Sequence, residues 1–379
     1  MNISQIYFLF TLYLVVVPVY WLIGSKNIFA KRAMLIIVSF VMLWLFYPPS
    51  ILILFFYYLA IWIFDAARRY GAPLSFLKQA SWLLFSPLLF TDFLAANQSI
   101  FPLLVPQAVP PHVAPILGLS FSALRAFLAV RDGLIRGAPS PSATLLSLSF
   151  FPTFLAGPIT GPANFESARQ TFDLEEALAG VCRIGWGAGL FLVAGPLVEQ
   201  YGLSPTPDTV GAWRNLFVHF AALFFDFAGY SEVAIGSGLL FGIKIPENFR
   251  VPFLARSMQE FWQRWHISLS SLIGIYLAKP MTRAWGQREL AILVSFIIVG
   301  LWHRVSPNYL IWGAGHGLAL VISLRLQRLP LRSFLPDRLV GVLGWTTTMT
   351  TVAVLSAVAN ADGIGGARTI ILQLAGLAS

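Results

Sequence analysis

Three of the five histidines of this chain fall in one stretch of its second half, between positions 266 and 316. His266 lies in QRWHISLSS, and His303 and His316 lie in GLWHRVSPNYLIWGAGHGL. Both stretches are otherwise rich in apolar and aromatic side chains. Ionisable groups in such surroundings are energetically expensive, which makes them candidates for a functional role.

Acyl transfer is the chemistry that suits this set of histidines. A neutral imidazole in an apolar cavity can take the proton of a hydroxyl while its oxygen attacks an activated acyl carbonyl. A second histidine or Arg264 would stabilise the oxyanion that forms. Pro307-Asn308 is typical of a turn between antiparallel helices, and it places His303 and His316 about 6 Å apart in depth. Both side chains are therefore expected to line one cavity.

Other chemistries find less support in the sequence. The three histidines have no nearby carboxylate to orient them as metal ligands, and Cys182 is the only cysteine. The chain contains no Gly-x-Ser-x-Gly elbow, phosphate-binding loop or dinucleotide fingerprint. We therefore expect no metal ion and no resident cofactor.

Two carboxylates, Asp226 and Glu232, lie in the apolar segment ALFFDFAGYSEVAIGSGLLFG. A polar contact between helices explains each of them at least as well as a reactive role. The small residues of the same segment suit close helix packing; they are Ala228, Gly229, Ser231 and Ser237. His112 lies in a loop and His219 in an isolated apolar context, and we expect no chemistry at either.

The elements that position these residues are membrane spans. Of the 379 residues, 57% are hydrophobic and 11% are charged, whereas soluble domains carry about 25% charged residues. Apolar runs of about 20 residues match the hydrocarbon thickness of a bilayer, so the sequence predicts a single all-α, polytopic membrane domain with about ten spans. The predicted spans are residues 5–24, 33–47, 50–64, 80–96, 113–130, 181–198, 213–243, 289–304, 309–326 and 338–358.

Loop charges predict the orientation. Lysines and arginines follow the first, third and fifth spans, whereas the loops around Pro48 and over 97–112 have none. Under the positive-inside rule this alternation places the N-terminus outside. The net charge of +9 has the same explanation, because no basic run suggests nucleic acid. Stretch 142–158 is interrupted by prolines and is expected to be re-entrant, and 266–280 is a second candidate.

The segments that carry the histidines resemble the membrane-bound O-acyltransferase family, in its bacterial envelope branch. The matching motifs are LGLSFSALRAFLAVRDG, FFPTFLAGPITGPANF, FFDFAGYSEVAIGSGLLFGIKIPENF, PFLARSMQEFWQRWHISLSS and GLWHRVSPNYLIWGAGHGL. They follow the order of the family and cover roughly residues 117–322. The resemblance implies a ring of tilted helices around a central tunnel, open to both faces.

The resemblance also implies roles for individual residues. His303 occupies the invariant catalytic position. His266 stands where animal members often carry asparagine, so it positions a substrate or polarises a carbonyl. His316 is a supporting residue, as are Arg264 and Asp226. Two departures stand out. Arg304 replaces the usual glycine, and the chain reads SSLIGIYLAKP where the bacterial subgroups usually carry a Trp-Phe-Arg-Asp-Tyr-like stretch. The interval of 37 positions between His266 and His303 is also shorter than the family usually has.

The implied activity is acyl transfer, with acetyl as the favoured group, from a cytoplasmic acetyl-CoA or acyl carrier protein to an extracytoplasmic polysaccharide. Lys279, Arg283 and Arg288 are candidates for docking the anionic donor. Transfer of D-alanine from a carrier protein to a teichoic-acid-like acceptor is the first alternative. A transporter or flippase is an alternative of another class. The expected setting is the bacterial inner membrane, with lipid around the protein and a separate extracytoplasmic acyltransferase as a further partner.

Overall fold

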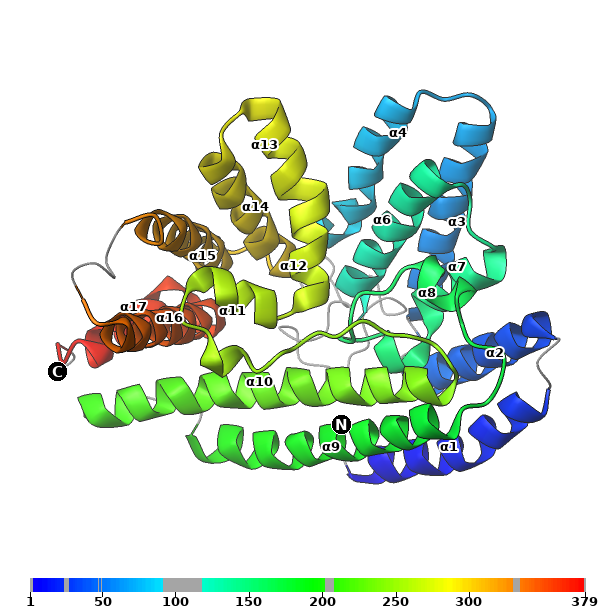
Figure 1. The fold of residues 1–379 in the computed structure, drawn as a ribbon, viewed down its shortest axis with the longest axis horizontal. Coiled ribbons are helices and arrows are strands. Elements are labelled where there is room, and N and C mark those ends of the chain that lie inside the picture. Colours follow the sequence, from blue (N-terminus) through cyan, green and yellow to red (C-terminus); the bar gives the residue numbers. More distant parts are fainter. Residues whose placement is uncertain are drawn as a thin grey trace. The chain divides into compact units, whose positions relative to one another are not determined.

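The computed structural model describes residues 3–23, 27–46, 48, 50–90, 118–201, 208–329 and 335–377, and every regular element among them is helical. Figure 1 shows this all-helical architecture. The backbone divides into two compact units, Met1–Ala188 with Tyr230–Pro246, and Gly189–Gly229 with Glu247–Ser379. Helices α9 (Leu174–Tyr201) and α10 (Thr209–Leu240) run through both units. The all-α class predicted from the sequence is confirmed.

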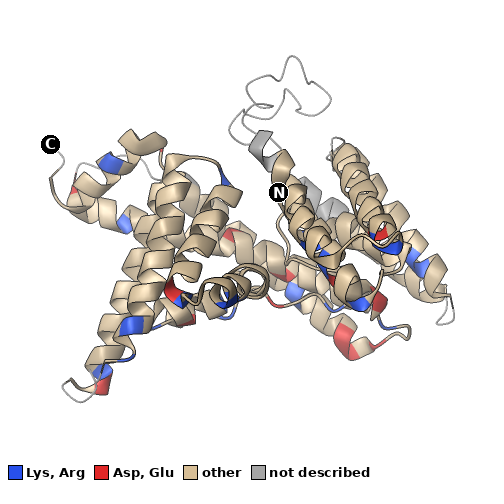
Figure 2. Cartoon of the chain, turned by 90° about the horizontal axis from the view of Figure 1, so that it is seen from above, with Lys and Arg blue, Asp and Glu red and all other residues tan. Residues whose placement is uncertain are grey.

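Six helices among the described residues are long and apolar enough to cross a membrane. They are Ile28–Phe46 in α2, Ser50–Arg69 in α3, Leu174–Val198 in α9, Thr209–Leu240 in α10, Pro307–Leu326 in α15 and Asp337–Asn360 in α16. Large apolar side chains face outward on them, such as Phe55, which is 68% exposed. Charged residues occupy short segments between long uncharged stretches of helix (Figure 2). The protein is a multi-pass membrane protein.

Six of the ten predicted spans correspond to these helices. Three others are also helical, in α1 (Ile3–Leu22), α6 (Leu119–Arg136) and α14 (Arg288–His303). In the described part of the predicted span 80–96, a 3-10 helix, Ser81–Phe90, follows α4 (Leu74–Ala80) in place of a continuous α-helix, and its crossing of the membrane stays a prediction. Pro87 lies inside this 3-10 helix, and proline lacks the N–H that a continuous α-helix requires.

The remainder of that predicted span, the start of the span at 113–130 and the loop over 97–112 lie outside the described residues. The loop includes His112. The tunnel, the ring of helices and the orientation of the N-terminus stay predictions.

Stretch 142–158 does not cross the membrane as a simple helix. Helix α7 (Pro141–Ser149) has nine residues and is therefore about 13 Å long, less than half the hydrocarbon thickness. A 3-10 turn, Phe151–Thr153, follows it. The buried Arg125 donates to the carbonyls of Thr153 and Phe154, which satisfies backbone groups that the break leaves open. The re-entrant path itself stays a prediction.

Within the first unit, α9 and α10 approach closely at two glycines. A Cβ added at Gly180 or Gly236 would meet the backbone of the other helix. Near this contact the Glu232 carboxylate lies 3.4 Å from the Arg183 guanidinium. Glu232 thus forms a polar contact between helices, one of the two interpretations that the sequence left open.

The second unit contains a helical hairpin that positions the histidines. Its first arm is helical from residue 267 to 285, through α12 (Ile267–Ile273), a π-helical turn (Gly274–Ala278) and α13 (Lys279–Trp285). Gly286, with φ of +67°, turns the chain into α14. Contacts of α14 with α13 and with the π-helical turn place the two arms side by side (Figure 1). The stretch over 266–280 is thus helical and locally distorted.

Helices α14 and α15 (Pro307–Leu326) form the next antiparallel pair. A Cβ added at Gly300 would meet the carbonyl of Tyr309, and one added at Gly313 would meet the carbonyl of Phe296. The two backbones therefore touch along a line of glycines, as small residues permit between membrane helices. This contact fixes the register of α15 against α14.

Candidate functional site

The helical hairpin brings two histidines, 37 positions apart, to the same end. His266 immediately precedes α12 and His303 is the last residue of α14. Because the arms are antiparallel, the start of the first arm and the end of the second lie at the same end of the hairpin. An electrostatic interaction connects His303 with His266, and another connects His303 with His316. The predicted grouping of the three histidines in one site agrees with this geometry.

The turn between α14 and α15 differs from the one predicted. It consists of Arg304, Val305 and Ser306, and Pro307 is the first residue of α15. Proline is favoured at this position because its missing N–H needs no partner there, and the Ser306 hydroxyl caps the helix by accepting from the Tyr309 N–H.

This shift of the turn changes the predicted depths. His316 stacks near Phe296, with ring centroids 6.4 Å apart, and Phe296 lies about 10 Å along the helix axis from His303. The expected depth difference of about 6 Å was therefore too small. The Trp312 ring spans the gap, with centroids 5.3 Å from His303 and 4.6 Å from His316.

Exposure distinguishes the three imidazoles. His266 and His316 are 3% and 1% exposed, whereas His303 is exposed. Within the described part of the chain, the His303 ring forms no hydrogen bond and contacts the rings of Trp302, Tyr309 and Trp312. Of the three, His303 is therefore the imidazole that a substrate can reach with its nitrogen atoms uncommitted.

Buried polar contacts hold His266 in place. Its Nδ1 lies 3.0 Å from Oδ1 of Asn248, which is fully buried. The Phe227 ring packs against the imidazole with centroids 4.8 Å apart and nearly perpendicular planes. His266 has a left-handed backbone, with φ of 44°, which is uncommon for a residue other than glycine. Such strained positions persist where the surrounding structure imposes them, and they concentrate at functional sites.

His316 lies among aromatic side chains beside a small cavity. The Trp262 ring is 5.2 Å from its imidazole, centroid to centroid. Among the described residues, neither Nδ1 of His316 nor Nε1 of Trp262 has a hydrogen-bond partner, although both atoms are buried. Trp262 and Phe296 also line a cavity of about 230 Å³, whose other walls include polar groups. Those polar residues are Gln259, Gln263, Ser270 and Ser295.

Comparison with known proteins agrees with this site. The model of the family described as MBOAT, membrane-bound O-acyltransferase, matches residues 196–357, which contain all three histidines. Over these residues the chain is similar to the membrane-bound O-acyltransferase family.

Curated relatives act on polymers of the bacterial envelope, by their names. A probable alginate O-acetylase AlgI of Azotobacter vinelandii is 31% identical over 237 residues, 59% of this chain and 47% of the relative. A teichoic acid D-alanyltransferase of Streptococcus thermophilus is 27% identical, over 84% of this chain and 82% of the relative. A peptidoglycan O-acetyltransferase of Helicobacter pylori is 33% identical, over 47% and 36%. This chain spans about half the length of the alginate O-acetylases that it matches.

Two of the departures from the family pattern have simple structural explanations. Arg304 has φ of −163° and ψ of 137°, an extended backbone that any residue adopts, so the usual glycine is not required there. The 37-position interval between His266 and His303 fits a compact hairpin whose arms join at Gly286 and Gln287. The interval therefore keeps both histidines at one end of the hairpin.

Arg264 and Asp226, two of the predicted supporting residues, have surroundings that leave their predicted roles untested. The Arg264 guanidinium pairs with Glu260 at 2.7 Å and donates to the Arg250 carbonyl at 3.1 Å. It thus ties α11 (Met258–Arg264) to the preceding segment, and its role at the oxyanion stays a prediction. Asp226 is exposed on α10, and among the described residues its carboxylate has no ion-pair or hydrogen-bond partner. Its supporting role is also untested.

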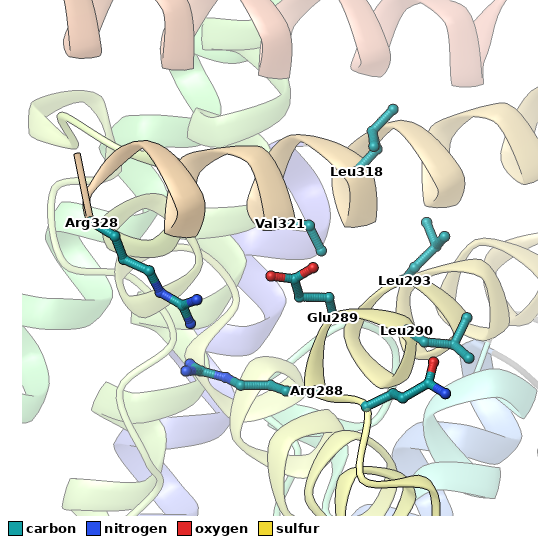
Figure 3. Close-up of a pocket in the computed structure, with 8 residues that line it drawn as sticks. Arg288, Glu289, Leu290, Leu293, Leu318, Val321 and Arg328 are labelled. Atoms are coloured by element: carbon teal, nitrogen blue, oxygen red, sulfur yellow. The ribbon is translucent and has the colours of Figure 1, made fainter.

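The donor-side candidates lie on the far half of the hairpin. Lys279 and Arg283 belong to α13, whereas Arg288 begins α14 and lines a cavity of about 580 Å³. Figure 3 shows the guanidiniums of Arg288 and Arg328 pointing toward one another at this cavity. The neighbouring Glu289 pairs with Arg325. In the described part of the chain, Arg288 and Arg328 form no ion pair.

The lining of this cavity also includes Gln287, the Glu289 carboxylate and an apolar wall. The apolar wall includes Leu290, Leu293, Leu318 and Val321 (Figure 3). Arg288 and Arg328, which form no ion pair among the described residues, lie next to this apolar wall and outnumber the single carboxylate of Glu289, which pairs with Arg325. Such a lining suits an anionic ligand with an apolar part.

Sequence reasoning missed Asn248 and Trp312, which the structure places against the histidines. Asn248 lies in the IPENF motif, and a buried amide beside a candidate histidine gives no signal until the fold is known. The position of Trp312 could have been inferred from its spacing to His316. It lies four residues before His316, so the two side chains share one face of α15.

Proposed function

We propose that this protein transfers an acyl group, with acetyl as the favoured group, from a cytoplasmic donor to hydroxyls of an extracytoplasmic envelope polysaccharide. The observation that carries the proposal is the exposed imidazole of His303, which has no hydrogen bond among the described residues and lies beside two buried histidines. The relatives named as O-acetyltransferases of alginate and peptidoglycan support the substrate class.

The proposed reaction is a direct transfer. His303 takes the proton of the attacking hydroxyl, the oxygen forms a bond to the acyl carbonyl, and the bond between carbonyl and sulfur breaks. The thiolate of the donor then leaves and receives a proton from the His303 imidazolium. No resident cofactor is required, because the donor supplies the activated acyl group.

A second candidate is transfer of D-alanine from a carrier protein to a teichoic-acid-like acceptor. It is favoured by coverage, because the D-alanyltransferase of Streptococcus thermophilus aligns with 84% of this chain, against 59% for the alginate O-acetylase of Azotobacter vinelandii. The chemistry at His303 would be the same, since both donors are thioesters. A transporter or flippase remains the alternative of another class.

The proposed setting is the inner membrane of a bacterium, with the N-terminus outside. The acyl donor, acetyl-CoA or an acyl carrier protein, approaches from the cytoplasm, and the polymer is modified on the other side. A separate extracytoplasmic acyltransferase is a further proposed partner. These proposals rest on the distribution of loop charges and on the relatives.

Deletion of the gene in its own bacterium tests the proposed function. We expect envelope polysaccharide from the deletion strain to release no acetate under mild alkali, while the wild-type polymer releases it. Loss of alkali-labile D-alanine instead would establish the second candidate. Normal acylation of the polymer, together with accumulation of an untransported precursor inside the cell, would refute both and favour the transporter.

The cavity at Arg288 leads to a prediction about the donor. In purified protein, Arg288→Glu should raise the KM for the anionic donor about tenfold with little change in kcat, because a hydrogen bond to a charged group contributes about 1.5 to 3 kcal/mol. Initial rates measured over a range of donor concentrations give both constants.

Arg283→Glu is the matched control, since it makes the same charge change on the facing arm and lies outside the cavity lining. We expect its KM to stay near the wild-type value. An equal rise in both variants would indicate general electrostatic attraction, and a rise confined to Arg283→Glu would move the donor site to α13.

A further inference from the structure

The side-chain oxygen of Asn248 receives three polar contacts in a fully buried position. His266 Nδ1 lies 3.0 Å away, the Ser268 hydroxyl donates at 2.9 Å, and the Ser268 backbone N–H donates at 3.4 Å. The Asn248 side chain is 0% exposed. A carbonyl oxygen with three polar neighbours fixes the orientation of the groups that contact it.

These contacts determine which His266 nitrogen carries the proton. A backbone N–H can only donate, so the Asn248 atom that it contacts is the amide oxygen, an acceptor. His266 Nδ1 must therefore donate to this oxygen and carries a hydrogen. In a neutral imidazole the other nitrogen, Nε2, then has a lone pair and is an acceptor.

The backbone supports this arrangement. The segment around Asn248 runs beside the residues on either side of His266, because Ile267 N–H donates to the Asn248 carbonyl and Arg250 N–H donates to the Arg264 carbonyl, each at 2.9 Å. The left-handed backbone of His266 is maintained by this pairing. Asn248 thus holds both the main chain and the ring of His266.

We propose that Asn248 is a positioning residue that fixes His266 as its Nδ1–H tautomer, so that Nε2 accepts a hydrogen bond from the acceptor substrate. The group that donates is a hydroxyl next to the one that His303 deprotonates, as a polyhydroxy acceptor such as a sugar provides. This inference rests on the proposed function. It selects between the two roles predicted for His266: orienting a substrate is compatible with this tautomer, whereas polarising a carbonyl requires a donor at Nε2.

The tautomer can be measured without any activity. Nitrogen-15 NMR of histidine-labelled protein in detergent reports which ring nitrogen carries hydrogen, and the His266 signals are those that disappear in His266→Gln. We expect a neutral ring protonated at Nδ1 in the wild type and a loss of that preference in Asn248→Ala. A wild-type ring protonated at Nε2 would overturn the proposal even if the protein proves to be an acyltransferase.

The activity of substituted proteins provides the second test. Asn248→Asp keeps the acceptor but adds a negative charge, which stabilises the His266 imidazolium. The acidic limb of the pH–rate profile should therefore move up by about one unit or more, and activity should recover at higher pH. Asn248→Ala should lower the rate about 10- to 100-fold, as the loss of a partner that orients a histidine does elsewhere.

Ser268→Ala is the control for these profiles. It removes one donor from the Asn248 oxygen but leaves the His266 contact, so the acidic limb should stay where it is in the wild type. His303 is the titratable group that interacts with His266, and it is unchanged in all of these variants. An unshifted limb in active Asn248→Asp would contradict the proposal.

Amide side chains of two lengths at position 266 distinguish the contributions of the two ring nitrogens to activity. Glutamine places its amide near the position of Nε2 and asparagine places its amide near that of Nδ1. We expect His266→Gln to retain more activity than His266→Asn at equal protein abundance. The reverse order would show that Nε2 contributes little and would overturn the proposal. Inactivity of the wild type toward every thioester donor would refute the proposed function but leave the NMR result intact.

Discussion

His303→Ala should abolish acylation while the protein still inserts and accumulates in the membrane. Removal of a general base typically lowers the rate by about 10² to 10⁴. The loss should be clean, because the exposed His303 ring makes no hydrogen bond to described residues whose loss would destabilise the fold. Transfer of radiolabelled acetyl from the donor to polymer, measured at equal protein abundance, gives the rate.

A matched substitution at another histidine of the same unit is His219→Ala. His219 is partly buried on α10 and is not part of the cluster, so this variant should stay near the wild-type rate. His266→Ala should also be severe, and His316→Ala should fall between the two because its buried ring shapes the site. A His303→Ala protein that acylates normally would refute the mechanism, and the similarity to the family would then describe the fold alone.

The grouping of the histidines was predictable because it depends on local patterns. Helix and turn signals in GLWHRVSPNYLIWGAGHGL indicate an antiparallel pair, and the structure has one. Its turn lies three residues earlier than predicted because the prediction assigns Pro307 to the turn, although proline also begins helices. Local sequence allows both positions, and packing decides between them.

Contacts between distant segments were not predictable in the same way. The hydrogen bond from His266 to Asn248 depends on two chain segments that pair through their main chains, and no periodicity indicates such pairing. The 3-10 helix over Ser81–Phe90 was missed for a related reason. Hydropathy measures how apolar a segment is, whereas its backbone geometry depends on Pro87 and on the neighbouring helices.

The glycine contact between α14 and α15 should be the most sensitive structural feature of the site. Gly313→Ala places a methyl group against the Phe296 carbonyl, and a backbone atom cannot rotate away as a side chain can. Overpacking of this kind costs about 1 to 3 kcal/mol, and we expect the upper end. The helices must separate, which also displaces His303, so both the Tm in detergent and the acylation rate should fall.

Gly185→Ala is the control that separates the steric effect of an added methyl group from the change in backbone entropy. Gly185 lies inside α9 and an added Cβ there meets nothing within 4 Å. Alanine is favoured over glycine in a helix by about 1 kcal/mol, so this variant should keep or raise the Tm. The same chemical change is thus expected to have opposite signs at the two positions. A Tm in Gly313→Ala at or above that of the wild type would mean that α14 and α15 are not in backbone contact, and the route by which α15 holds His316 beside the hairpin would be wrong.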